Sequence, residues 1–109
     1  MTDRELLEKA AKAAGWSARQ SAFRANNFVV EFEPDSWTAW NPLTDDGDAL
    51  RLAVKLGLVV AAHKNYAIVS LPYEGEALCH VPIAKDPYAA TRRAIVRAAA
   101  AMDERKPQV

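Results

Sequence analysis

The run LVVAA at residues 58–62 is apolar at every position, and this feature most restricts how the chain can fold. Side chains of a strand alternate between the two faces of its sheet, so a strand with one wet face carries polar residues at every second position. The next apolar run, residues 66–71, also breaks this alternation, apart from Ser70. We therefore expect both faces of this sheet to be covered.

Turn-forming residues divide the same region into strands that are separated by loops of hairpin length. Residues 63–65 (HKN) and 72–76 (PYEGE) are the two expected loops, which predicts an antiparallel meander. A further strand is expected at FVVEF, because its first, third and fifth residues place three apolar side chains on one face. The predicted strands are residues 28–32, 58–62, 66–71 and 77–83.

Three segments show the apolar spacing of an amphipathic helix, and capping residues set their bounds. The predicted N-caps are Thr2, Thr44 and Asp86, with Pro87 opening the last helix, and the glycines expected to end the first two are Gly15 and Gly57. In the second helix, Leu50, Ala53, Val54 and Gly57 form an apolar stripe, which Leu52 and Leu56 widen. The predicted helices are residues 3–14, 45–56 and 87–102. The tryptophan-containing segment 34–42 (PDSWTAWNP) is expected to be an ordered loop.

These elements predict one α+β domain over residues 1–109, because a chain of this length supports one core. We expect a three-layer α/β/α sandwich with an antiparallel sheet of three to four strands and three helices. Helices 45–56 and 87–102 are placed on one face of the sheet. Helix 3–14 and strand 28–32 are placed on the other.

Cysteine usage and the amino terminus indicate the compartment. Cys79 is the single cysteine, which fits a reducing cytosol better than a secreted scaffold. Residues 1–12 (MTDRELLEKAAK) mix acids and bases and lack the apolar stretch of a signal peptide. No stretch reaches the 18 to 20 apolar residues of a membrane span. We predict a cytoplasmic protein without a membrane partner.

Charge is balanced overall, with 14 basic and 14 acidic residues, but it is uneven along the chain. Residues 1–48 carry five bases and nine acids, and residues 49–109 carry nine bases and five acids. A strongly basic domain would indicate nucleic-acid binding through neutralisation of phosphates. Here only the second half of the chain has an excess of basic residues, so we expect any phosphate binding to be confined to that half.

Two stretches resemble a group of small phage and prophage proteins of unknown function, described as a phage ABA sandwich domain. They are residues 40–50 (WNPLTDDGDAL) and residues 90–100 (ATRRAIVRAAA). The resemblance covers the chain from about residue 37 onward and implies a layered fold in the cytoplasm of a host cell. It implies no activity, cofactor or site residue.

From Asn41 onward, the order helix, three strands, helix also resembles double-stranded RNA-binding domains. Those domains hold RNA through the first helix, a loop after the first strand and a basic cluster at the start of the last helix. Here the first helix opens with Asp45, Asp46 and Asp48, and the bases of the last helix lie a turn or more inside it. The phosphate-binding residues of this alternative are Arg92, Arg93 and Arg97.

No spacing predicts a metal site, a cofactor or a catalytic group. The acidic run at residues 45–48 lacks the ligand spacing of a calcium loop and is interpreted as capping of the second helix. Cys79 and His80 are neighbours on a strand, so their side chains point to opposite faces and cannot act as a pair. Cys79 is interpreted as a small buried apolar residue.

Trp37 and Trp40 are the candidate partner-binding residues, because tryptophans in a loop are the residue type that anchors protein interfaces. Trp40 is expected to pack under the second helix, and Trp37 is the more accessible of the two. We predict a non-enzymatic phage accessory protein that binds another protein, a second copy of itself included. The alternative is the nucleic-acid module described above.

Overall fold

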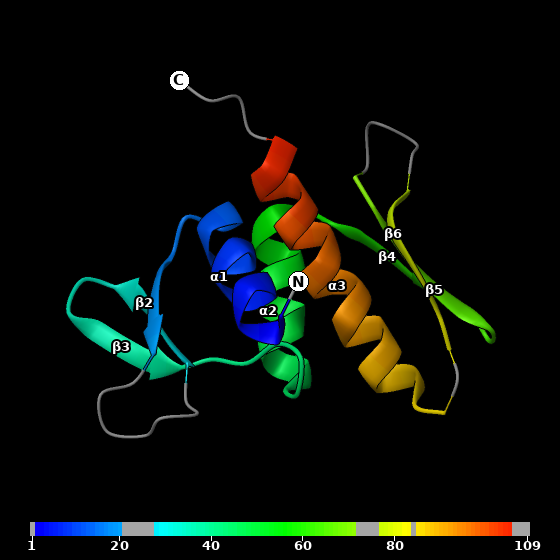
Figure 1. Cartoon of the computed structure of the whole chain (residues 1–109), viewed down its shortest axis with the longest axis horizontal. Coiled ribbons are helices and arrows are strands. Elements are labelled where there is room, and N and C mark those ends of the chain that lie inside the picture. The colour runs from blue at the N-terminus through cyan, green and yellow to red at the C-terminus, as the bar shows by residue number, and fades with distance from the viewer. Residues whose placement is uncertain (1, 21–27, 72–76, 84, 106–109) are drawn as a thin grey trace.

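The longest helix, α3 (Pro87–Arg105), lies at the centre of the computed structural model, with other elements on both sides of it (Figure 1). α1 (Asp3–Ala13) and α2 (Asp46–Leu56) pack against it. Three of its alanines, Ala94, Ala98 and Ala99, have no exposed surface. Small side chains at these positions let neighbouring elements approach closely. α3 is therefore the helix around which the core is built.

The structure describes residues 2–20, 28–71, 77–83 and 85–105. The predicted loop at 72–76 and the last four residues of the polar tail lie outside the described residues. α3 continues three residues beyond its predicted end at Met102.

In the described part of the chain, six strands form two separate antiparallel sheets of three strands each. The first sheet has the order β1-β2-β3, and its strands are Ser17–Gln20, Phe28–Glu33 and Ser36–Ala39. The second has the order β4-β5-β6, and its strands are Val59–Ala62, Tyr66–Ser70 and Ala77–Pro82. The second sheet is the predicted meander, with ends shifted by one residue.

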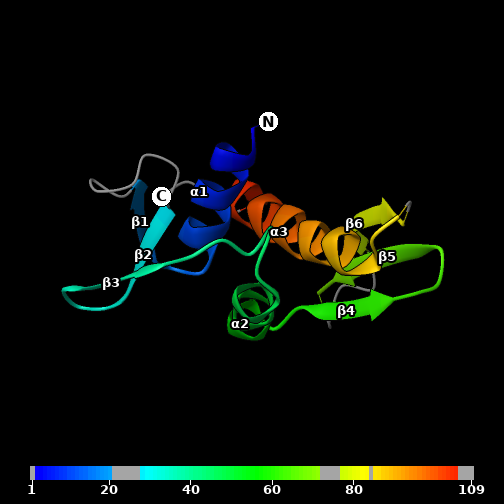
Figure 2. The same cartoon turned by 90° about the horizontal axis from the view of Figure 1, so that it is seen from below.

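The three helices lie between the two sheets, as Figures 1 and 2 show. α1 contacts the first sheet through β1, and α3 contacts all three strands of the second. The α+β class with three helices is confirmed, whereas the prediction of a single sheet between helix layers was wrong. The reason is that β2 pairs with β1 and β3 and builds a sheet of its own.

Strands β1 and β3 were missed by the sequence prediction. The segment predicted to be a loop turns sharply at Asp35, whose φ of 63° lies in the left-handed region. The chain then runs back along β2, with Trp37 opposite Glu31. Both missed strands are four residues long and mostly exposed, so neither shows the apolar alternation by which strands are recognised.

The helix ends follow capping chemistry, with one correction. Asp45, rather than Thr44, is the N-cap of α2, and its Oδ1 accepts a hydrogen bond from the Asp48 backbone N–H at 2.8 Å. Thr2 caps α1, and the Asp86 carboxylate accepts hydrogen bonds from the first turn of α3, as predicted. Gly57 ends α2 with a φ of 66°, where a residue with a Cβ is strained.

The expectation that both faces of the second sheet are covered was wrong. α3 packs on the face that carries the buried Ala67 and Val69. On the other face, no described element covers the sheet. The rings of His63 and His80 lie there on either side of Tyr66, with centroids 4.6 and 5.0 Å from the tyrosine ring.

Candidate functional site

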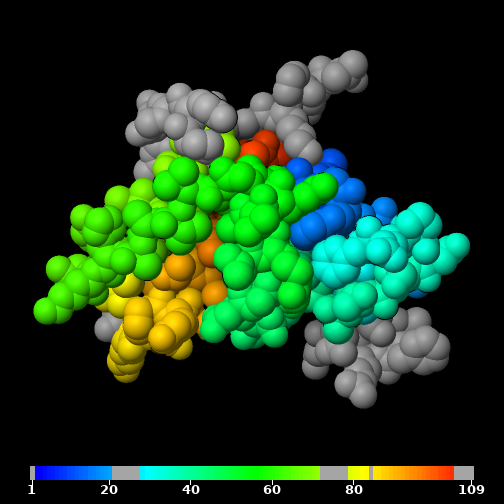
Figure 3. Space-filling view, turned by 180° about the vertical axis from the view of Figure 1, so that it is seen from behind, coloured from blue at the N-terminus to red at the C-terminus, as the bar shows by residue number. Residues whose placement is uncertain are grey.

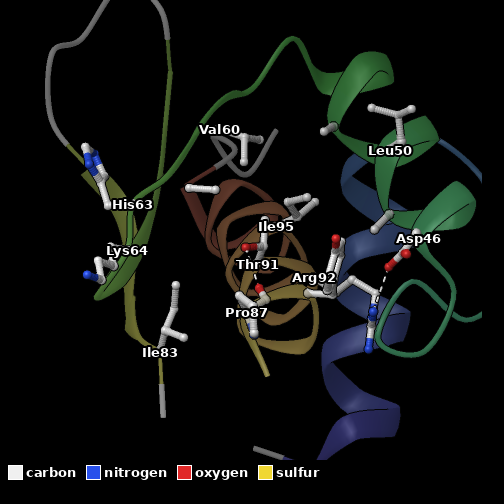
Figure 4. Close-up of a pocket in the computed structure, with 14 residues that line it drawn as sticks. Asp46, Leu50, Val60, His63, Lys64, Ile83, Pro87, Thr91, Arg92 and Ile95 are labelled. Atoms are coloured by element: carbon white, nitrogen blue, oxygen red, sulfur yellow. Dashed lines mark hydrogen bonds and ion pairs between the residues drawn. The ribbon is translucent and has the colours of Figure 1, made fainter. Parts of the chain in front are cut away.

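An open groove of about 660 Å³ lies between α2, α3 and the β4–β5 hairpin (Figure 4). The walls come from three elements that are distant in sequence. α2 and α3 supply one side and the floor, and the hairpin supplies the other side. Most of the lining side chains are apolar. The residues that line it are Asp46, Ala49, Leu50, Ala53, Val60, Ala62, His63, Lys64, Ile83, Pro87, Tyr88, Thr91, Arg92 and Ile95.

Exposed apolar side chains surround this groove. Leu50 is 64% exposed, Val60 37% and Tyr88 67%, and each comes from a different wall. Burying an apolar side chain of this size stabilises by roughly 1.5–3 kcal/mol, so leaving several exposed together is unfavourable without a partner. Contiguous apolar patches of this kind mark interaction sites.

α2 exposes these residues because it is apolar on two faces. Its buried face consists of Ala49, Leu52 and Ala53, which pack against the core. Leu50 and Val54, four residues apart, form a ridge on the exposed face, where Val54 is 72% exposed. Of the predicted stripe, Ala53 and the widening residue Leu52 are therefore buried and Leu56 is half-buried, whereas Leu50 and Val54 are exposed.

A second, shallower groove of about 440 Å³ lies on the opposite side of this ridge. Trp16 and Phe32 form its far wall, and Arg51 and Lys55 of α2 line the near wall. Leu50 borders both grooves. Figure 3 shows the face concerned, with α2 crossing it between the hairpin and the first sheet. The apolar surface therefore continues across α2.

The polar side chains on the helical side of the first groove are engaged within the protein. Arg92 Nη1 donates to Asp46 Oδ1 at 2.6 Å, and its Nε donates to the Leu43 carbonyl at 2.9 Å. Thr91 Oγ1 donates to the Pro87 carbonyl at 2.7 Å (Figure 4). The two Arg92 bonds tie α3 to α2 and to the turn before it, and all three bonds occupy polar groups that would otherwise be available to a small polar ligand on this side of the groove.

Lys64 is the exception among the charged groups of the groove. It lies with His63 at the end of the β4–β5 hairpin, and no ion pair joins it to any residue in the described part of the chain. Because Asp46 and Arg92 neutralise each other, Lys64 leaves the groove with a net positive charge at this end.

The structure separates the two predicted partner-binding tryptophans from this groove and from each other. Trp40 is 2% exposed, which confirms the expected burial, and its ring packs against Trp16 and Phe28 at centroid distances of 5.9 and 6.3 Å. Trp37 is half-buried on β3, and the Arg19 guanidinium stacks over it 4.0 Å from the ring centroid. Binding of a partner by either tryptophan stays a prediction.

Two of the three arginines of the phosphate-binding alternative are engaged in ion pairs. Arg92 is bound to Asp46, and Arg93 Nη2 lies 2.9 Å from Asp3 Oδ1. Arg97 is exposed and affects Cys79 electrostatically. The three guanidinium groups do not form one open cluster.

Cys79 and His80 lie on opposite faces of β6, as expected from their spacing. Cys79 is half-buried against the core, and this burial raises the pKa of its thiol, an effect that Arg97 opposes. Among the described residues, no three His, Cys, Asp or Glu side chains come together as metal ligands. Within the same residues, no helix is both long enough and apolar enough to cross a bilayer.

Comparison of the chain with protein-family models, with curated proteins and with solved structures finds no match in any of the three.

The groove between α2, α3 and the β4–β5 hairpin was not predicted from the sequence. One signal for it is present, since α2 carries more apolar residues than a single buried stripe requires.

Proposed function

We propose that this chain is a non-enzymatic protein-binding module whose groove between α2, α3 and the β4–β5 hairpin holds an apolar segment of another protein. The observation that carries the proposal is the exposure of Leu50, Val60 and Tyr88 around one open groove. Apolar, concave surfaces with anchoring pockets are typical of peptide recognition. A role as a phage or prophage accessory protein belongs to the same proposal and rests on the resemblance at residues 40–50 and 90–100.

The chemistry of the lining favours a protein segment over a small polar ligand. A small-ligand site needs several convergent polar groups to fix the orientation of its ligand. Here Arg92 and Thr91 make their hydrogen bonds within the protein. What the groove offers is apolar area, which an apolar side chain of a partner can cover.

The charge at the hairpin end adds one requirement for the partner. Lys64 has no carboxylate partner in the described part of the chain, so an acidic residue at the matching end of the segment gains a salt bridge there. Such an exposed pair adds about 0.2–1 kcal/mol and contributes more to orientation and rate of binding than to affinity.

The test is selection of peptides from a random display library on the immobilised protein, followed by fluorescence-anisotropy titration of the selected peptides. We expect apolar peptides with an acidic residue near one end. Val60→Asp, which places a charge in the groove, should weaken their binding at least tenfold. Lys64→Glu should weaken it by a smaller factor and most strongly at low salt.

Val59→Asp is the matched control. Val59 is the neighbour of Val60 on β4 and is 44% exposed, but it pairs with Ser70 on the opposite face of the sheet. This variant introduces the same charge one position away and should leave peptide binding unchanged. Equal losses in both variants, or selected peptides that are insensitive to Val60, would contradict binding in the groove.

A further inference from the structure

We propose that the free edge of β4 is a self-association site, at which β4 of a second copy adds in antiparallel orientation to give one continuous six-stranded sheet. The order β4-β5-β6 gives β4 only one neighbour in its sheet. All four of its residues are apolar, Val59, Val60, Ala61 and Ala62, and no proline or charged residue interrupts them. Edges that avoid pairing often carry such residues, and β4 has neither of these two devices.

The hydrogen bonds of the hairpin establish which groups face outward. The His63 backbone N–H donates to the Tyr66 carbonyl at 2.8 Å, so these directly opposed residues are a hydrogen-bonded pair. Bonded and non-bonded pairs alternate along an antiparallel ladder. It follows that Ala61 and Val59 bond to Ile68 and Ser70, whereas Val60 and Ala62 point their N–H and C=O groups away from β5.

This alternation limits how two identical strands can pair, because outward groups must meet outward groups. Registers centred on Val60 or on Ala62 pair one outward residue of each β4 with a residue outside the strand, whereas the register centred on Ala61 pairs both outward residues within it. In that register Val60 of one copy lies opposite Ala62 of the other, and the reverse. Each such pair exchanges two hydrogen bonds, which gives four in all. The twofold axis then passes between the two Ala61 residues, which face each other as a non-hydrogen-bonded pair with a Cα–Cα distance of about 4.5 Å. Alanine is small enough for this close contact.

The side chains brought together in this register are compatible. Val60, which is 37% exposed, is covered by Ala62 of the second copy, and Val59 is covered by His63. Lys64 lies opposite Leu58, so the pairing brings no two like charges together across the strands. A net charge of zero also leaves no long-range repulsion between copies. The hairpin projects from the body of the molecule, where a second strand can reach it (Figures 1 and 3).

Strand pairing of this length buries less surface than the roughly 1,200–2,000 Å² of a standard stable interface, so we expect a reversible dimer. The twofold axis is perpendicular to the sheet, so both grooves open on the same face of the dimer. A ligand with two binding segments would then be held at both. The inference does not rest on the proposed function, because it concerns the backbone edge and needs no partner protein.

The experiment is light scattering and sedimentation of the full chain over about 1 to 500 μM, combined with variants of the edge. We expect the mass to rise with concentration from the 12.0 kDa of one chain toward twice that value. Val60→Pro should hold the protein at the monomer mass. Its circular dichroism should be unchanged, because the N–H that proline removes points away from β5.

Cysteine crosslinking tests the register directly, in a chain in which Cys79 is replaced by Ser. Under mild oxidation, Ala61→Cys should form a covalent dimer in high yield, because position 61 faces itself. Val60→Cys is the matched control: position 60 faces position 62, and the two cysteines are separated by more than the roughly 7 Å that a disulfide spans. A monomer at every concentration, or equal crosslinking of both variants, would overturn the proposal. If Val60→Pro does not fold, the comparison of the two cysteine variants still decides.

Discussion

The carboxylate of Asp48 accepts a hydrogen bond from the backbone N–H of Asn41 at 2.9 Å, while its other oxygen contacts the Arg51 guanidinium at 2.5 Å. Asp48 is the one charged residue that is buried among the described residues, at 7% exposure. The Asn41 side chain in turn accepts a bond from the Leu43 N–H at 3.0 Å. The acidic run therefore holds the turn that leads from β3 into α2.

Removing this carboxylate should destabilise the protein. Asp48→Ala leaves the Asn41 amide without its acceptor, and we expect a loss of about 1–3 kcal/mol in urea unfolding. Asp46→Ala is the control, because it breaks an ion pair whose carboxylate is 67% exposed and should cost about 0–1 kcal/mol. Millimolar calcium should leave the melting temperature of the wild type unchanged. Equal losses in both variants, or stabilisation by calcium, would contradict this role.

Trp40 and Trp37 should respond differently to truncation. Trp40→Ala empties a core position and should cost about 3–5 kcal/mol. Trp37→Ala removes a half-exposed ring and its contact with Arg19, and should cost about 1 kcal/mol. Thermal and urea unfolding measure both. A loss of several kcal/mol from Trp37→Ala would make Trp37 a core residue and exclude it as a partner-binding residue.

Deletion of residues 1–15 should give an aggregating or molten product. α1 buries Leu6, Leu7, Ala10 and Ala11 in the core and packs along α3. Its removal exposes the alanine face of α3, whereas the sequence had suggested exposure of a sheet face. Dye binding and near-ultraviolet circular dichroism report the outcome. A truncated chain with an unchanged cooperative melt would show that α1 is dispensable.

Thiol reactivity should follow the raised pKa of Cys79. Burial favours the neutral thiol, so reaction with a disulfide reagent should be slow near pH 8 and should accelerate only above the ordinary pKa of 9.0. Stability should fall in the same alkaline range, because the unfolded chain releases this proton at lower pH than the folded chain does. Arg97→Gln removes the cation that lowers the pKa and should slow the reaction further. A native rate equal to that in urea would contradict the effect of burial.

Duplex RNA should not bind measurably at physiological salt. Arg92 and Arg93 are each held by a carboxylate, so few phosphates can be neutralised without breaking ion pairs. A gel-shift titration at micromolar protein should show no saturable complex for the wild type or for Arg93→Glu. A complex that weakens steeply with salt and is lost in Arg93→Glu would instead support the nucleic-acid alternative.

The helices and the second sheet were predictable because their signals are local. Capping residues such as Asp86 and stop residues such as Gly57 act within one turn of the helix end that they define. β1 and β3 were not predictable, because their side chains are mostly exposed and the turn between β2 and β3 depends on Asp35 in a left-handed conformation.

The layer order and the groove depend on contacts between distant segments, and the sequence does not show these. The apolar run of β4 was interpreted as burial on both faces, although one face and the edge are open. Leu50 and Val54 satisfy helical spacing as well as Ala49 and Ala53 do, so periodicity alone could not decide which stripe faces the core. The same run of residues that suggested a covered sheet thus marks the proposed site of self-association.

The central position of α3 has a consequence for synthesis on the ribosome. Each sheet is formed from hairpins between neighbouring strands and can pair as soon as it emerges. The helix that joins α1, α2 and the second sheet follows all of them in the chain. The apolar faces of α1 and of the second sheet that pack on α3 therefore stay uncovered in a nascent chain until residues 87–105 have left the exit tunnel.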